Sequence, residues 1–166
     1  VAFNNSGTVT IQQGTLGLLS GGTSTGDFTI AAGATLTLEG IHKLLGGETL
    51  VGFGGILDPT NGPLYIGATG ETESAKLTNF GTITSDVIIE GGILRGAGVI
   101  EGDLILRGAN VKNTQREEGL SENIEVLGDL IIEAPGFGLA EQVGSILVGD
   151  NIVYQGTAIV RAPFVL

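Results

Sequence analysis

Aspartate is the residue type in this chain that recurs in a pattern suited to chemistry. The motif Asp-apolar-variable-apolar begins at Asp27, Asp86, Asp103 and Asp129, and a degraded copy begins at Asp150. Two carboxylates that face each other across a sugar can cleave a glycosidic bond, and clustered carboxylates can bind Ca²⁺. Here each aspartate begins its own short apolar segment. The pattern therefore favours a structural residue at a chain corner over a weak cation site or a catalytic pair.

The chain offers few other residues for catalysis or metal binding. It has no cysteine, and its single histidine, His42, stands beside Lys43, which favours an exposed corner residue over a ligand or a base. No Gly-x-Ser-x-Gly element supports a Ser-His-Asp triad. The glycine-rich stretch at 52–55 lacks the Gly-Lys-Ser/Thr ending of a phosphate loop, and no calcium-loop motif is present. We therefore predict a protein that is not an enzyme and needs no metal or cofactor.

Threonine pairs suggest a further binding function. Three pairs have the spacing Thr-x-Thr: Thr8/Thr10, Thr35/Thr37 and Thr82/Thr84. Such pairs bind ice in some β-solenoids when they recur on successive turns. They do not recur in successive copies of the aspartate motif, so ice binding is only a minor alternative.

The composition bounds the class of the protein. The 166 residues include 30 glycines and four prolines, and 42 % of them are apolar, mostly valine, isoleucine and leucine. That is enough for one aliphatic core, so we expect a single domain over residues 1–166. Eighteen acidic residues against seven basic ones give a net charge of −11, which disfavours nucleic acid as a partner. No apolar run is long enough for insertion into a membrane.

Internal similarity indicates how the aspartates are positioned. The segment at 5–11 returns at 79–84, and the segment at 14–19 is echoed at 33–38, with irregular offsets near 17 to 26 residues between consecutive copies. Short Val/Ile/Leu/Thr strands separated by Gly, Asn and Asp corners are typical of coiled strands that stack about 4.8 Å apart. We predict an all-β parallel β-helix, or β-solenoid, of about seven irregular turns. An antiparallel sandwich is the alternative.

Two segments interrupt this pattern as corner insertions. One lies near 58–76 and contains Pro59, Pro63 and the Glu71/Glu73 pair, and the other lies near 111–123 and is charged. Loops on a rigid scaffold often carry binding function, but solvated corners are the favoured interpretation here.

The glycine-rich segment 91–103, GGILRGAGVIEGD, resembles the "GGTLxGxGxVxGD" signature of autotransporter-associated β-strand repeats. Residues 108–111 stand where that family has a "GATLAPG" corner, 124–132 are similar to its "LTVNGDLTL" strand, and 149–160 to its closing "DxLxVxGTAxL" turn. The N-terminal third is similar to repeats of large bacterial surface adhesins. The resemblance implies a right-handed β-helix that is displayed at the bacterial cell surface or secreted.

Strand alternation identifies candidate core and surface positions. The candidate core residues of the glycine-rich region are Ile93, Val99, Leu104 and Leu106. The variable position of the aspartate motif holds Ile88, Ile105 and Ile131, which alternation places on the outside as an exposed apolar stripe. An exposed apolar stripe predicts an interface, unless another segment of the chain covers it.

Both ends of the sequence are apolar. We expect a self-assembly interface formed by Val1, Phe3, Phe164, Val165 and Leu166, because an uncapped solenoid end offers strands for pairing and a head-to-tail contact that does not close makes a filament. The chain begins without methionine, which suggests a processed product or one piece of a longer protein.

The predicted function is that of a non-enzymatic, extracellular structural protein, a subunit of a bacterial surface fibre that binds copies of itself. The first alternative is an adhesin passenger fragment that binds surface or matrix glycans. The second is a polysaccharide lyase or hydrolase.

Overall fold

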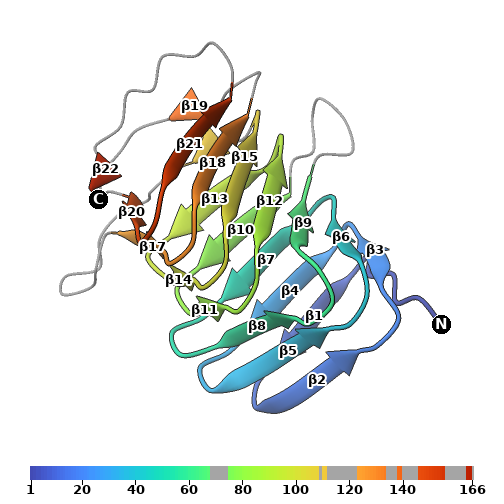
Figure 1. Cartoon of the computed structure of the whole chain (residues 1–166). Helices are drawn as coiled ribbons and strands as arrows, with labels where there is room; N and C mark the ends of the chain where they lie inside the picture. The colour runs from blue at the N-terminus through green and yellow to red at the C-terminus, as the bar shows by residue number, and fades with distance from the viewer. Residues whose placement is uncertain are drawn as a thin grey trace.

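The computed structural model of the chain describes residues 1–67, 75–108, 110–111, 123–133, 138–139, 146–155 and 164–165. These residues form strands and corners without any helix, and the strands coil into a three-sided parallel β-solenoid (Figure 1). The parallel β-helix predicted from the sequence is therefore the fold. No described segment is a helix long and apolar enough to cross a membrane.

Each turn from β1 to β21 adds one strand to each of three sheets, which we name A, B and C, and β22 adds a further strand to sheet B. Sheet A consists of β1 (Thr8–Ile11), β4 (Asp27–Ile30), β7 (Glu48–Val51), β10 (Lys76–Asn79), β13 (Ile93–Gly96), β16 (Asn110–Val111) and β19 (Gly138–Leu139). Sheet B consists of β2 (Gly14–Leu18), β5 (Ala34–Leu38), β8 (Ile56–Pro59), β11 (Thr82–Ile83), β14 (Val99–Ile100), β17 (Ile124–Val126), β20 (Ile146–Val148) and β22 (Phe164–Val165). Sheet C consists of β3 (Gly22–Ser24), β6 (His42–Leu44), β9 (Leu64–Ile66), β12 (Val87–Glu90), β15 (Leu104–Arg107), β18 (Leu130–Glu133) and β21 (Ile152–Gln155).

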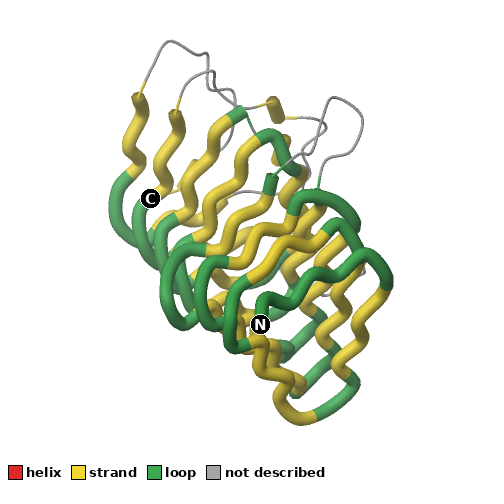
Figure 2. The backbone as a smooth tube through the Cα atoms, turned by 90° about the vertical axis from the view of Figure 1, so that its right-hand side faces the viewer, coloured by secondary structure: helices red, strands yellow, loops and turns green. Residues whose placement is uncertain are grey.

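Successive turns stack in register along the rod (Figure 2). In sheet C, for example, Leu104 pairs with Leu130 and Leu106 pairs with Ile132. Five successive turns, β1 to β15, are described with one gap at 68–74. Because every strand keeps the same phase as its neighbour, alternate side chains of all three sheets point into one narrow core.

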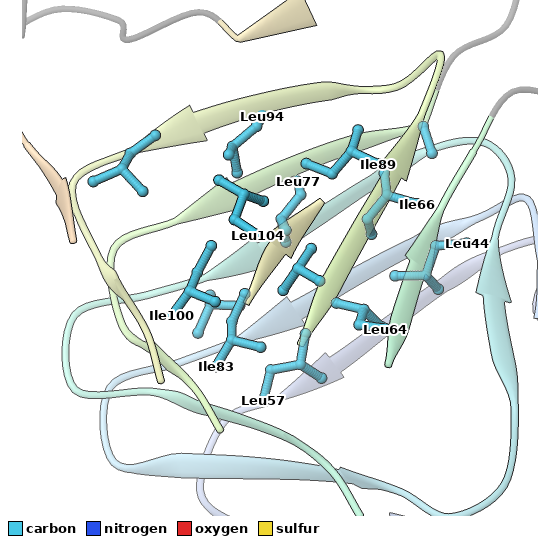
Figure 3. Packing of buried hydrophobic residues seen from close by; sticks show 14 of the residues in the cluster. Leu44, Leu57, Leu64, Ile66, Leu77, Ile83, Ile89, Leu94, Ile100 and Leu104 are labelled. Carbon is cyan, nitrogen blue, oxygen red and sulfur yellow. The ribbon is translucent and has the colours of Figure 1, made fainter. Parts of the chain in front are cut away.

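Aliphatic side chains from all three sheets fill that core (Figure 3). Leu104 and Leu106 are fully buried, as predicted. The prediction was wrong for Ile93 and Val99, which are half-buried on the outside, while the next residues, Leu94 and Ile100, are 0 % exposed. Two apolar residues in succession hide the phase of a short strand, because alternation needs a polar neighbour to show which one points inward.

Glycines occupy corners where the backbones of adjacent turns come closest. A Cβ on Gly96, whose φ is +111°, would lie 2.0 Å from the carbonyl oxygen of Asn79. A Cβ on Gly98 would lie 2.5 Å from the carbonyl oxygen of Gly81. The corners of this region therefore require residues without side chains, which explains the glycine-rich stretch at 91–108.

Two asparagines tie corners to the following turn. The Oδ1 atom of Asn5 accepts a hydrogen bond from Gly7 N, and its Nδ2 atom donates to the carbonyl oxygen of Asp27. The side chain of Asn79 does the same with Gly81 N and with the carbonyl oxygen one turn ahead. Both asparagines are buried, so these bonds satisfy polar groups that have no access to water.

Part of the insertion expected at 58–76 belongs to the solenoid. Strand β8 ends at Pro59, and β9, at Leu64–Ile66, pairs with both β6 and β12. The Glu71/Glu73 pair lies outside the described residues, as does most of the predicted insertion at 111–123.

Candidate functional site

The aspartates that immediately precede the strands of sheet C form a column along the rod. Each carboxylate accepts a hydrogen bond from the next turn. The Oδ1 atom of Asp86 accepts a hydrogen bond from Asp103 N at 2.9 Å, and Asp103 Oδ1 accepts one from Asp129 N at 2.8 Å. Asp129 Oδ1 accepts two, from the backbone N and the Nδ2 atom of Asn151, both at 2.9 Å. These bonds confirm the structural interpretation of the three aspartates.

The other aspartate motifs deviate from this column. Asp27 lies in sheet A, where its Oδ1 atom accepts a hydrogen bond from Glu48 N at 2.8 Å. In the degraded copy, Asn151 rather than Asp150 takes the aspartate position, since Leu130 pairs with Ile152. Within the described part of the chain, no group of three or more His, Cys, Asp or Glu residues could hold a metal ion.

His42 is buried, contrary to the expectation of an exposed corner residue. It is the first residue of β6, its exposed fraction is 2 %, and neither ring nitrogen has a hydrogen-bond partner. Burial lowers the pKa of His42, an effect that the facing carbonyl of Phe3 offsets in part. The prediction failed because His42 pairs with Gly22, which leaves room for the ring inside the solenoid.

The outer face of sheet C carries an apolar column that includes the predicted stripe. Register aligns five outward side chains: Tyr65, Ile88, Ile105, Ile131 and Val153. The alignment agrees with the prediction, but the predicted exposure does not hold. Ile88 is 6 % exposed, and Ile105 and Ile131 are half-buried. Large side chains stacked about 4.8 Å apart shield one another from water.

Charged groups flank the apolar column. Arg107 and Glu133 form a two-pronged ion pair, with Nε–Oε2 at 2.6 Å and Nη2–Oε1 at 3.2 Å. The hydrogen bond from Arg107 lowers the pKa of Glu133 and raises that of Arg107. Lower on the same face, Lys43 Nζ lies 5.8 Å from the ring centroid of Tyr65. A hollow of about 130 Å³ there is lined by Lys43, Leu45, Tyr65, Ile66, Gly67 and Glu90.

The threonine pairs do not form one rank. Thr8 and Thr10 lie on β1 of sheet A, whereas Thr35 and Thr37 lie on β5 of sheet B. Between β5 and β11, which begins at Thr82, sheet B contains β8, where Ile56 and Asp58 occupy the outward positions. A flat threonine face on successive turns is therefore absent from the described residues.

Among the described residues, two strands of the first turn have an edge without a partner strand. Strands β1 and β2 are the outermost described strands of sheets A and B, whereas β3 is covered by the N-terminal segment Val1–Asn5. Phe3 N donates to the carbonyl oxygen of Gly21 at 3.0 Å, and Thr25 N donates to that of Asn5 at 2.8 Å. Phe3 therefore takes part in covering β3, while its side chain remains 37 % exposed.

At the other end, β22 extends sheet B. Its residues Phe164 and Val165 pair in parallel with Ile146 and Leu147 of β20. Leu166, the last residue of the predicted interface, lies outside the described residues.

Several exposed apolar side chains at corners were missed by the sequence analysis. Leu19 and Ile41 are 67 % and 62 % exposed between sheets B and C. Phe53, which is exposed, stacks on the half-buried Phe80 at the corner between sheets A and B, with ring centroids 5.1 Å apart. A phenylalanine next to glycine is the available signal, since glycine marks the corner and leaves the ring without a core position.

No family model, curated protein or solved structure matches this chain. The resemblance to autotransporter-associated repeats therefore rests on the sequence motifs, and the assignment of function rests on the geometry described above.

Proposed function

We propose that this chain is a non-enzymatic structural β-solenoid, the subunit of a bacterial surface fibre that lengthens when copies join their sheets head to tail outside the cell. The observation that carries the proposal is the chemistry of the open edges. Residues 1–26 contain no charged side chain, so β1 and β2 present backbone groups without the charges that usually prevent edge pairing.

The backbone of β1 shows which groups are free to pair. Asp27 N and Ala31 N donate to the carbonyl oxygens of Gly7 and Ile11. In a parallel ladder, alternate residues of a strand direct their N–H and C=O groups to the same neighbour. The intervening residues, Thr8 and Thr10, therefore direct theirs away from β4, towards the open edge.

The remainder of the rod disfavours side-by-side association. All 18 acidic residues follow residue 26, so the lateral faces of two copies repel each other. An uncharged end on an acidic rod favours contact along the rod axis, which continues the sheets and has the open symmetry of a filament.

Electron microscopy and sedimentation velocity of the purified chain test the proposal. We expect fibres or concentration-dependent oligomers for the wild type. On β2, Leu18 accepts a hydrogen bond from Glu39 N on the β5 side, so alternation directs Thr15 N–H to the open edge. The variant Thr10→Pro/Thr15→Pro therefore removes one N–H from each open edge and keeps the inward bonds, so it should remain monomeric with an unchanged β-sheet circular dichroism spectrum. The matched control Thr10→Val/Thr15→Val retains both N–H groups and should assemble like the wild type. Monodisperse wild-type monomers at high concentration would refute the proposal, as would equal assembly of the proline variant.

One observation favours a second candidate function, the binding of surface or matrix glycans. The hollow on sheet C combines the half-buried ring of Tyr65 with Lys43 and Glu90, and an aromatic face beside charged hydrogen-bonding groups suits a sugar ring. A glycan array with wild-type protein and the variant Tyr65→Ala tests this function. Binding that Tyr65→Ala does not reduce would exclude the hollow as the site.

A further inference from the structure

His42 and the N-terminal segment meet across Gly22. A Cβ on Gly22 would lie 1.9 Å from the carbonyl oxygen of Phe3 and 3.2 Å from His42 Nε2. The missing side chain therefore lets the imidazole of β6 and the carbonyl of the N-terminal segment approach the same space. His42 is 2 % exposed there, so the segment and β3 together separate its ring from water.

The N-terminal segment is held on β3 by polar contacts. Thr23 N donates to Asn4 Oδ1 at 2.9 Å, while Thr25 N and Gly26 N both donate to the carbonyl oxygen of Asn5, at 2.8 and 3.1 Å. Asn5 N in turn donates to Ser24 Oγ at 3.3 Å. These contacts join uncharged groups, and a change in pH within the neutral range does not alter them directly.

Among the residues that the structure describes, no charged group near His42 compensates for a positive charge on its ring. Strand β3 contains no titratable side chain, and Leu64 is the residue of β9 opposite His42. The titratable groups nearby are Lys43 and Tyr65, which alternation places on the outer face, and the α-amino group of Val1, which donates to Ser20 Oγ. An imidazolium at this position would therefore be buried without a carboxylate partner.

We propose that the segment Val1–Asn5 is an acid-sensitive cover of the sheet C edge, which stays on β3 while His42 is neutral and leaves it when His42 is protonated. Departure of the segment lets water reach the ring and opens β3 as a third edge strand. The proposal concerns contacts within one copy of the chain and does not depend on fibre assembly.

The direction of the pH effect follows from the lowered pKa of His42. Burial lowers its pKa in the covered state below the ordinary value of 6.5. The stabilisation of the cover is therefore complete above about pH 6.5 and is lost as the pH falls towards the lower value of the covered state. Uptake of one proton changes the ratio of covered to open molecules by up to about tenfold per pH unit in this window.

NMR spectroscopy of the intact chain measures both the protonation of His42 and the departure of the cover. The single histidine gives one unambiguous imidazole signal for the first measurement. Amide exchange of Thr23, Thr25 and Gly26, corrected for intrinsic rates, reports the cover between pH 7.5 and 5. We expect protection at these three amides to fall by up to about tenfold per pH unit below pH 6.5. The amide of Leu127, which lies far along the rod and donates to the carbonyl oxygen of Ile100, should keep its protection.

Two variants separate the switch from general acid destabilisation. His42→Gln has a neutral polar side chain that does not titrate, so protection at Thr23, Thr25 and Gly26 should become independent of pH. If that variant does not fold, Gly22→Ala provides the second measurement. Its methyl group displaces Phe3, so the three amides should be unprotected at every pH and the His42 pKa should return towards 6.5. Constant protection in the wild type down to pH 5, or a wild-type His42 that titrates at or above 6.5, would overturn the proposal.

Discussion

The aspartate column of sheet C makes a sharp prediction about Asp103. Its Oδ1 atom accepts the hydrogen bond of Asp129 N at 2.8 Å, and its own N–H donates to Asp86 Oδ1 at 2.9 Å. Alanine at this position removes the acceptor and leaves the N–H of the next turn without its partner. Asparagine keeps an oxygen in the same place and removes only the negative charge. If the carboxylate serves as a backbone acceptor, the two variants should differ in stability.

The magnitude follows from two opposing contributions. Both variants remove the charge of Asp103, so both relieve its repulsion with Asp86 and Asp129, which is roughly 0.9 kcal/mol per pair in water at about 4.8 Å. Both also lose the bond to a charged acceptor, but asparagine keeps a neutral acceptor at the same place. Because a neutral hydrogen bond contributes about 0.5–1.5 kcal/mol, Asp103→Ala should be less stable than Asp103→Asn by about 1 kcal/mol.

Urea denaturation at pH 7 with matched salt checks these values, with midpoints compared because a repeat protein need not unfold in two states. Salt adds an internal control. Screening reduces the repulsion in the wild type, so the stability of both variants relative to the wild type should fall as salt increases, whereas the difference between Asp103→Ala and Asp103→Asn should persist. Equal midpoints for the two variants at low and high salt would refute the interpretation of the column as a set of backbone acceptors.

Three further predictions concern the corner, the core and the ion pair. Gly96→Ala should lower the free energy of unfolding by about 3 kcal/mol, because its Cβ would clash with the preceding turn, whereas Gly14→Ala, at φ +72° with open space around it, should lose about 1 kcal/mol in the same urea titration. Leu104→Ala, at a position 0 % exposed, should lose about 2–5 kcal/mol in thermal or urea unfolding. Arg107 lowers the pKa of Glu133, so the carboxylate stabilises the fold above its ordinary pKa and this stabilisation is lost as the pH falls through the folded value. Any deficit of Arg107→Gln at pH 7 should therefore begin to shrink below about pH 4.5 and vanish once the pH is below the lower folded pKa, in midpoints measured across pH.

The fold class was predictable because its signals are local. Apolar alternation, glycine at corners and aspartate before each strand act within a few residues, and stacking of equal units turns them into sheets. The alignment of Ile88, Ile105 and Ile131 followed from the same logic, because each follows its aspartate at the same distance. Alternation predicts the direction of each side chain but not the size of its neighbours in the column. Ile88 is buried because those neighbours are large.

The position of His42 required information that is distant in the sequence. Its burial depends on Gly22 in the preceding turn and on Phe3, 39 positions away from it. A histidine next to lysine has the local composition of a surface corner. The contact that makes it a core residue exists only once register has placed a glycine opposite it, so the sequence pattern pointed to the wrong environment.

The two asparagine motifs show why sequence similarity in this chain does not assign a side of the rod. Asn5-Ser6-Gly7 and Asn79-Phe80-Gly81 make the same bonds, yet the strand after the first is β1 in sheet A and the strand after the second is β11 in sheet B. The motif specifies a corner at which the asparagine amide reaches the following turn, and two different corners of the solenoid use it. Turns of unequal length then shift the motif from one corner to another without disturbing the core. A functional face of this solenoid is therefore defined by register between turns, as in the aspartate column, and a motif identifies such a face only after the strand that follows it has been assigned to a sheet.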